Sequence, residues 1–316
     1  MMKIREKMRY SSFPFGVYFL LIGVIAAFFI ATQGTISPSH LLNIMRQASP
    51  LGIAAMGQTI VLLVGGIDLS VGATISMVNL VAASLMLGKI ENLFIAILVS
   101  MLLCLLIGFM NGYIIAHFKM QPFLVTMAMS MIVEGGYYIY TKGIAKGSIA
   151  AEFRFISEGW IGSLPIAGII WVVLWALLSF VLRRTSYGHR LYITGGNQAA
   201  SRLSGFRSEA IVISAYMLCS LLAGIAGLML SAYIGTASTG VGADYTLNSI
   251  ASTVVGGTAF SGGIGSLEGT FPGVLITVIL QSMMTIIGIS EAGKFIVQGV
   301  VIASMFGINQ TRKNRR

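Results

Sequence analysis

Residues 65–72 of the chain read Gly65-Gly66-Ile67-Asp68-Leu69-Ser70-Val71-Gly72. They place a carboxylate between two hydrophobic runs, 51–64 and 71–87, in a sequence whose charged residues make up only 9%. An acid at membrane depth is costly to bury, so it normally faces a bundle interior, a water-filled path or a helix end. The flanking glycines indicate a broken backbone, which membranes accept only against protein or along a cavity. Asp68 and Ser70 therefore cap the following helix, contact a solute, or do both.

Composition sets the class of protein. Apolar residues make up 56% of the chain and 38 residues are glycine, which excludes an ordinary soluble domain. The 316 residues suffice for about ten spans of roughly 20 residues each. We expect an all-α polytopic membrane protein with about ten transmembrane helices. Its parts are a basic N-terminus (1–13), a transmembrane domain (14–309) and a basic tail (310–316).

The net charge of +10 is interpreted as membrane topology. Most of the 20 basic residues lie in three segments, 3–9, 183–207 and 312–316, while the other polar gaps are nearly balanced. Because basic loops stay in the cytoplasm, both termini and the loop 183–209 are expected there, which requires an even number of spans. The expected surroundings are membrane lipids, and nucleic acid is not an expected partner.

The predicted spans follow the hydrophobic runs. Two stretches, 51–64 and 245–258, are shorter than a straight crossing needs and are interpreted as half-helices. The segment 40–49 is amphipathic and ends at Pro50, so it can lie in the membrane interface. The runs are 14–32, 41–64, 71–88, 93–117, 122–141, 165–182, 210–233, 245–258, 268–288 and 294–309.

A second glycine-rich stretch matches the first one in the other half of the chain. Val64-Gly65-Gly66 corresponds to Val255-Gly256-Gly257, and each motif leads from a short apolar run into another hydrophobic run. Glycine breaks at matching positions indicate an internal repeat with a translocation path between its halves. The alternative is that these glycines serve close helix crossings, which are common in membrane bundles.

The inner loop contains a predicted short helix. Gly195-Gly196-Asn197 would start it with Asn197 as the cap, residues 198–204 continue it, and Gly205 ends it. Apolar residues recur at helical spacing beside Arg202. Because so short a helix does not persist alone in water, it must dock either on its own membrane domain or on a cytoplasmic partner.

Residue types for catalysis and metal binding are scattered. Cys104 and Cys219 lie inside hydrophobic runs, and the three histidines have no metal-ligand spacing. The sequence has no phosphate-binding loop of the G-x-x-x-x-G-K-[ST] type and no nucleophile–base pair. We therefore expect no metal, no cofactor bound by this chain and no enzymatic activity, with any ATP hydrolysed by a separate polypeptide.

Four stretches, in order, make the chain similar to the permease subunits of ribose-type bacterial ABC importers, from about residue 40 to about residue 307. They are residues 65–72, Gly112 with Pro122-Phe123-Leu124-Val125-Thr126, the loop 187–205, and Gly256-Gly257-Thr258-Ala259-Phe260-Ser261-Gly262-Gly263-Ile264-Gly265-Ser266. The chain departs from the family pattern at Gln198, Thr246 and Asn248, where acids are frequent, and at Glu134, where a basic residue is common.

The resemblance implies a type II importer fold and several partners. These are an ABC ATPase subunit, with two ATP-binding domains below the membrane dimer, a periplasmic or extracellular substrate-binding protein, and a second permease, either a second copy of this chain (a homodimer) or a paralogue (a heterodimer). It also implies that 197–204 is the coupling helix that seats in the ATPase. The predicted function is import of a monosaccharide or similar small polyol.

Three groups of residues are predicted to carry this function. The translocation path is assigned Asp68, Ser70, Asn79, Asn111, Thr258 and Ser261. The backbone breaks are assigned Gly65, Gly66, Gly72, Gly256, Gly257, Gly262 and Gly263. ATPase coupling is assigned Gly188, Asn197, Ala199, Ala200, Arg202 and Gly205.

Three other functions stay open. An ion-coupled secondary transporter would use Asp68 or Glu134 as its proton or sodium site. An ABC permease for a nucleoside, a furanone signal molecule or a branched-chain amino acid would share the architecture. A membrane scaffold is disfavoured, because it has no use for an intramembrane acid and paired breaks.

Overall fold

The structure is a computed structural model that describes residues 14–32, 37–197, 201, 205–290, 292–294, 296, 297, 299 and 300. The helices of its first half are α2 (Phe15–Ala31), α3 (Pro38–Leu63), α4 (Val71–Met86), η1 (Ile90–Asn92), α5 (Leu93–Phe118) and α6 (Pro122–Thr141). Those that follow are α7 (Ala151–Glu158), α8 (Ile166–Arg184), α9 (Ser186–Gly196), α11 (Ser208–Ile234), α12 (Ala243–Val255) and α13 (Leu267–Ile286). An antiparallel hairpin pairs β1 (Trp160–Ile161) with β2 (Leu164–Pro165).

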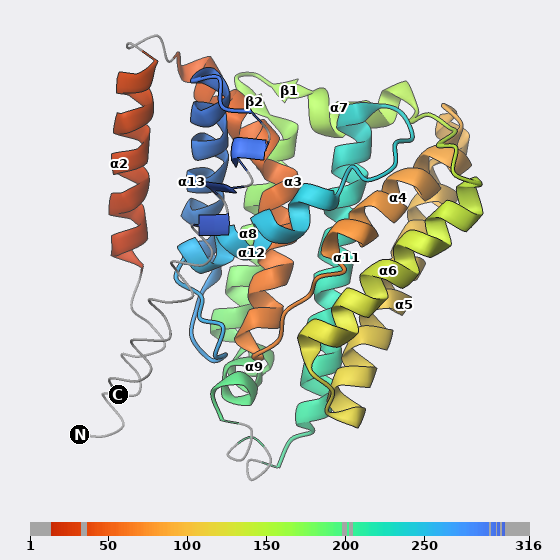
Figure 1. Cartoon of the computed structure of the whole chain (residues 1–316), viewed down its shortest axis with the longest axis vertical. Coiled ribbons are helices and arrows are strands. Elements are labelled where there is room, and N and C mark those ends of the chain that lie inside the picture. The colour runs from red at the N-terminus through yellow and green to blue at the C-terminus, as the bar shows by residue number, and fades with distance from the viewer. Residues whose placement is uncertain are drawn as a thin grey trace.

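The helices form one bundle with two distinct ends (Figure 1). Helix α9 lies at one end, which we call the α9 end, and the β1–β2 hairpin and α7 lie at the other, the hairpin end. Helices α3, α11 and α13 run along the bundle, and α12 runs across it. Helix α2 packs beside α13, while α4, α5 and α6 form the opposite side.

Helix α11 is the centre of the bundle. It packs against α3, α4 and α5, and its buried side chains include Tyr216. Small residues let α5 approach closely: a Cβ at Gly108 would lie 2.6 Å from the Tyr216 carbonyl oxygen, and one at Gly112 would lie 2.6 Å from Ile213 Cα. These two glycines serve a close helix crossing rather than a break.

Helix α3 corrects the prediction made for its sequence. It is one continuous helix of 26 residues that passes through Pro50, so 40–49 is not a separate interfacial segment and 51–64 is not a half-helix. A proline is tolerated inside such a helix when neighbouring groups make up for the lost backbone bond. The polar residues that made 40–49 amphipathic, among them Arg46 and Gln47, face a cavity inside the protein instead of the membrane surface.

Helix α12 is short, as predicted. Its 13 residues rise about 20 Å at 1.5 Å per residue, which is less than the hydrocarbon core of a bilayer. The chain then breaks over 256–266, descends toward α9 and returns as α13 (Figure 1). The run 245–258 is thus a half-helix that ends inside the bundle.

In the part of the chain that is described, five helices are long and apolar enough to cross a membrane. They span Ile90–Phe118, Pro122–Thr141, Ile166–Arg184, Ser208–Ile234 and Leu267–Ile286. Helices α2 and α4 are shorter apolar helices. Most of the predicted last span, 294–309, lies outside the described residues, so the count of ten stays a prediction.

Candidate functional site

The first break begins with a glycine cap. Gly65 has φ +82°, which favours glycine, and its N–H donates to the Leu62 carbonyl at 2.9 Å. The next N–H, of Gly66, donates to the Val61 carbonyl at 3.0 Å. This pair of bonds is a Schellman motif, which satisfies carbonyls that the end of α3 would otherwise leave without partners.

The second break begins with the same motif, displaced by one residue from the predicted correspondence. Gly257 has φ +89°, and its N–H donates to the Val254 carbonyl at 2.9 Å. The next N–H, of Thr258, donates to the Thr253 carbonyl at 3.1 Å. Gly65 therefore corresponds to Gly257 and not to Gly256. The predicted match of Val64-Gly65-Gly66 to Val255-Gly256-Gly257 is wrong by one position, because sequence alone does not say which glycine takes the left-handed conformation.

Gly256 and Gly72 have a different role from the glycines that turn the chain. Gly256 keeps φ −65°, and a Cβ there would lie 2.5 Å from the Gly269 carbonyl oxygen of α13. Gly72 lies in the first turn of α4 and packs against the backbone of Gly242. Both were predicted to be backbone breaks, and the structure makes them close-crossing glycines, the alternative interpretation.

The two breaks meet each other and the end of α9. We call this contact the glycine junction and define it as Gly65, Gly195, Gly196, Gly262 and Gly263. It joins the end of α3, the last turn of α9 and the loop between α12 and α13, three segments that are far apart in the sequence.

Backbone atoms of the junction lie too close together for side chains. The Gly263 N–H donates to the Leu63 carbonyl at 2.9 Å. A Cβ on Gly195 would collide with that same carbonyl oxygen, and one on Gly262 would lie 2.7 Å from the Gly195 oxygen. A Cβ on Gly263 would lie 2.6 Å from Gly196 Cα. Glycine is therefore required on all three segments.

Helix α9 was not predicted. Its N-cap Thr185 accepts a hydrogen bond from the Gly188 N–H at 3.5 Å, and the helix runs to Gly196. Gly195 and Gly196 thus form its last turn instead of starting the next helix. Three glycines in 11 residues lower the intrinsic helix propensity. Burial between α8, α11 and the breaks stabilises α9 in spite of this low helix propensity.

Only some of the predicted coupling residues lie in the described part of the chain. Asn197 has an extended backbone and its carbonyl accepts from the Ser201 N–H at 2.9 Å, and Gly205 has φ +76°. Gly188 packs against the Leu182 carbonyl at the turn from α8. Ala199, Ala200 and Arg202 lie outside the described residues. The coupling role of the whole set stays a prediction.

Asp68 fixes the first break from within. The Ser70 N–H and hydroxyl donate to Asp68 Oδ1 at 2.8 and 2.6 Å, and the Asn111 amide donates to the Ser70 hydroxyl at 3.0 Å. With its amide oriented to satisfy both groups, Gln58 pairs with the backbone N–H and carbonyl of Asp68 at 3.2 Å each. Asp68 is only 1% exposed, so its carboxylate holds the turn that leads into α4.

The remaining predicted path residues lie apart from this cluster. Asn79 ties α4 to α11 and to the segment after it: its amide donates to the Ser231 hydroxyl of α11 at 3.1 Å and accepts from the Ser238 N–H at 2.8 Å. Thr258 is buried and Ser261 is exposed in the second break. None of the six predicted path residues is among the described residues that line the two cavities below. Their path role stays a prediction.

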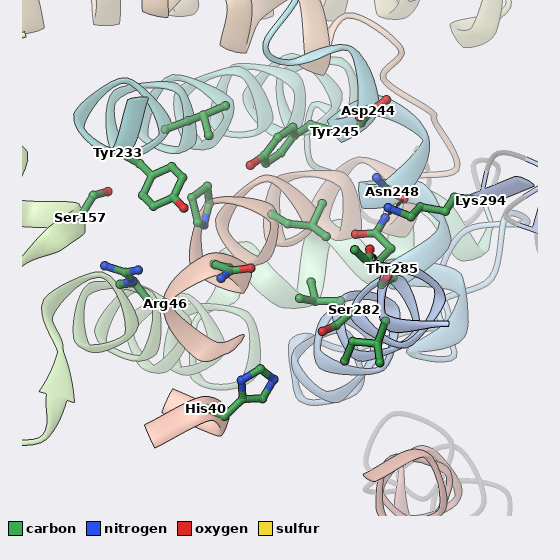
Figure 2. A pocket seen from close by; sticks show the side chains of 17 residues that line it. His40, Arg46, Ser157, Tyr233, Asp244, Tyr245, Asn248, Ser282, Thr285 and Lys294 are labelled. Atoms are coloured by element: carbon green, nitrogen blue, oxygen red, sulfur yellow. Dashed lines mark hydrogen bonds between the residues drawn. The ribbon is translucent and has the colours of Figure 1, made fainter. Parts of the chain in front are cut away.

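A cavity of about 500 Å³ opens between α3, α12 and α13 at the hairpin end (Figure 2). Arg46 and Tyr233 lie on one side of it, with Asp244, Asn248 and Lys294 on the other. Among its described lining residues are His40, Arg46, Gln47, Ser157, Tyr233, Asp244, Tyr245, Asn248, Gln281, Ser282, Thr285 and Lys294. We call it the hairpin-end cavity.

Aromatic rings and an amide pair organise this cavity. The Arg46 guanidinium carbon lies 6.0 Å from the centre of the Trp160 ring and 5.7 Å from that of Tyr233, within cation–π range. Across the cavity, Gln281 Nε2 donates to Asn248 Oδ1 at 3.0 Å. The sequence analysis assigned none of these residues to the path. The sequence feature that could have indicated them is the presence of polar side chains on otherwise apolar helices.

A second cavity, of about 290 Å³, lies toward the α9 end. It is bordered by the first break at Gly65 and Gly66, by Thr194 of α9, by Tyr216 and by the start of α11. A cavity thus lies near each end of the bundle, with the glycine junction beside the second.

A bundle of apolar helices, paired helix breaks that meet inside it and a polar cavity at one end together define a membrane permease. The comparisons with known proteins agree: residues 40–305 match the family described as "Branched-chain amino acid transport system / permease component". The chain belongs to this family, and it is a multi-pass protein of the inner membrane.

Individual relatives are similar over most of the chain. The ribose import permease protein RbsC of Bacillus subtilis is 32% identical over 92% of this chain and 89% of the relative. RbsC of Escherichia coli is 36% identical over 86% of this chain and 88% of the relative. The galactose/methyl galactoside import permease protein MglC of Haemophilus influenzae is 28% identical over 94% of each. No solved structure matches. The resemblance to ribose-type permeases is confirmed.

Proposed function

We propose that this chain is the membrane subunit of an ATP-binding-cassette importer that moves a monosaccharide or similar small polyol into the cell. Its family and the names of its relatives support the transport class and the sugar cargo. The observation that carries the proposal is the glycine junction. There, one helix from a basic loop touches both breaks of the membrane domain.

The loop around α9 is the expected place for an ATPase to act. It is bounded by basic residues such as Arg183, Arg184 and Arg207, which favour a cytoplasmic position. If an ATPase subunit displaces α9, Gly195 presses on the Leu63 carbonyl and Gly196 presses on Gly263. A single displacement is thereby transmitted to both breaks, which is what alternating access requires of a coupling element.

Side-chain bonds add to this connection. The Tyr192 hydroxyl of α9 donates to the Gly265 carbonyl of the second break at 2.9 Å. Burial raises the pKa of Tyr192 to about 12, so the hydroxyl keeps its proton at neutral pH. Arg183 at the end of α8 pairs with Glu268 in the first turn of α13, with Nε and Oε1 2.6 Å apart.

The finer arrangement belongs to the same proposal. We infer about ten transmembrane helices with an internal repeat, and both termini and the α9 end in the cytoplasm. The proposed partners are an ABC ATPase, which binds the ATP, an external substrate-binding protein at the hairpin end, and a second permease subunit. The identical first bonds of the two breaks support the repeat.

The experiment is an uptake measurement. The chain is expressed in cells with and without candidate ATPase and binding-protein subunits, and uptake of labelled monosaccharides is measured. Uptake that needs both partners is the expected result. Uptake by the chain alone, abolished by an uncoupler, would instead establish the ion-coupled alternative with Asp68 as its site.

A further inference from the structure

We propose that the hairpin-end cavity is a binding site, within the permease itself, for the neutral monosaccharide cargo. Arg46, Asn248 and Gln281 are the side chains that select the sugar. This inference rests on the proposed function, because it concerns the cargo of that importer. It goes further by naming a site that the sequence did not indicate.

The size and lining of the cavity suit a small polyhydroxylated molecule. Its volume of about 500 Å³ falls within the range of small-molecule sites. Amides and hydroxyls of α12 and α13 line one wall: Asn248, Gln281, Ser282 and Thr285. Such groups both donate and accept hydrogen bonds, as sugar hydroxyls do.

Arg46 is held in place with donors left over. The rings of Trp160 and Tyr233 fix its guanidinium from the hairpin and from the end of α11. Its Nε is buried and has no hydrogen-bond partner in the described part of the chain, and the same holds for His40 Nε2 in the same cavity. A guanidinium carries five donors in a fixed plane. Buried donors of this kind call for an acceptor, which a sugar hydroxyl oxygen in the cavity supplies.

The amide pair supplies the complementary groups. The bond from Gln281 Nε2 to Asn248 Oδ1 uses one donor of Gln281 and one acceptor of Asn248. In the described part of the chain this leaves the Asn248 amide hydrogens and the side-chain oxygen Oε1 of Gln281 to meet a ligand. A donor and an acceptor side by side match two adjacent hydroxyls of a sugar ring.

The cavity holds charges of both signs. Arg46 and Lys294 are cations, and the carboxylate of Asp244 lies on the far side from Arg46 (Figure 2). A sugar phosphate or a sugar acid would be attracted by the two cations and repelled by this carboxylate. A neutral sugar can accept from Arg46 and donate to Asp244 together.

The site is also placed to respond to the glycine junction. Arg46 is on α3, which ends in the first break, Asn248 is on α12, which ends in the second break, and Gln281 is on α13, which begins after it. Any movement of the two breaks therefore changes the spacing of the three selecting side chains. The cavity can bind the sugar in one state of the importer and release it in the other.

The test uses the whole importer, permease with its ATPase, in lipid nanodiscs without the binding protein. D-ribose, D-galactose and ribose 5-phosphate are titrated while tryptophan fluorescence is recorded. Trp160, beside Arg46, is the reporter, and Trp160→Phe identifies its share of the signal. A neutral sugar is expected to change the Trp160 signal saturably, and ribose 5-phosphate, which is not the cargo of the proposed importer, is expected to do so more weakly.

The variants are Arg46→Met, Asn248→Leu and Gln281→Leu, and each removes hydrogen bonds to the sugar. Each is expected to raise the apparent Kd about tenfold, with Arg46→Lys intermediate because it keeps the charge but loses the planar donors. Arg154→Met is the matched control: Arg154 is on α7 at the same end, is paired with Glu158 and does not line the cavity. Co-purification with the ATPase verifies that each variant is folded.

Two outcomes would overturn the inference while leaving the proposed function intact. One is that the Arg46, Asn248 and Gln281 variants bind and import sugar like the wild type. The other is that ribose 5-phosphate binds better than the neutral sugars. If ATPase-dependent uptake itself is absent in the wild-type complex, it is the proposed function that fails.

Discussion

The first and second breaks start alike and then differ. Each opens with a left-handed glycine, Gly65 or Gly257, and the same two backbone bonds. The first break then reaches the next helix within five residues, tied down by Asp68. The second continues to Ser266 through three more glycines with positive φ, two of which belong to the glycine junction. We infer that the first break is a rigid turn held by Asp68 and that the second break is shaped by its contact with α9.

The largest effect is expected where α9 touches both breaks. Gly195→Val puts a side chain onto the Leu63 carbonyl, in a place that has no room for one atom more. Overpacking of this kind costs about 1–3 kcal/mol or more, and here it also displaces both breaks. We expect loss of uptake and a lower unfolding temperature of the purified protein.

The control for this variant is Gly135→Ala on α6, where a Cβ meets nothing within 4 Å. It should transport like the wild type. If Gly195→Val does so too, the junction does not link α9 to the breaks.

A smaller loss should follow from removing the group that fixes the first break. Asp68→Leu leaves the Ser70 N–H and hydroxyl buried without their acceptor, at a cost of about 2–3 kcal/mol. Asp68→Asn keeps one acceptor oxygen and should cost less than half of this. The measurement is chemical unfolding in detergent, together with uptake.

Uptake by the two Asp68 variants distinguishes a structural role of Asp68 in the first break from a role as an ion site. If the role is structural, Asp68→Asn retains most transport. If Asp68 is an ion site, Asp68→Asn abolishes uptake while the fold stays stable. That result would contradict the inference that Asp68 serves to hold the first break.

The register of the repeat is tested by comparing neighbouring glycines. Gly257→Ala costs only the strain of a left-handed alanine, about 1 kcal/mol, because a Cβ there meets nothing within 4 Å. Gly256→Ala collides with α13 at Gly269 and should cost about 2 kcal/mol or more. Thermal unfolding of the two variants decides: no loss of stability in Gly257→Ala would contradict a left-handed backbone at Gly257 and with it the correspondence to Gly65.

The smallest effect should come from the second break's side-chain bond to α9. Tyr192→Phe removes the donor to the Gly265 carbonyl and costs about 1 kcal/mol at most. We expect normal folding with weaker coupling, seen as a lower uptake rate per ATP hydrolysed. Thr141→Val serves as the comparison and should leave that ratio unchanged, because in the described part of the chain the Thr141 hydroxyl bonds only to carbonyls of its own helix α6.

Sequence reasoning found the helices and the breaks because both are local properties. Apolar runs mark helices such as α5 and α11, and glycines such as Gly65 and Gly257 mark points where a left-handed backbone is needed. The one-residue error at Gly256 arose because a crossing glycine and a turning glycine look alike in sequence. Only the contact of Gly256 with Gly269 separates them.

The hairpin-end cavity and α9 escaped prediction for a different reason. Arg46, Asn248 and Gln281 are single polar residues on three helices, and no local pattern says that they face one space. Helix α9 contains Gly188, Gly195 and Gly196, which lower helix propensity, and burial in the bundle outweighs that preference. Likewise, the polar residues on 40–49 suggested a membrane surface because the partners of Arg46, Trp160 and Tyr233, lie 114 and 187 residues further along the chain.

The bonds between α3 and the second break bear on how the protein is made. Besides the bond from Gly263 to Leu63, the buried hydroxyls of Thr59 and Thr270 lie 2.7 Å apart, although 211 residues separate them in the chain. At about 5–20 residues per second, a ribosome needs roughly 10–40 s to synthesise that interval. For that time α3 lacks the contacts that it makes with the second break and with α13. The packing around the first break is therefore completed only when α13 has been inserted.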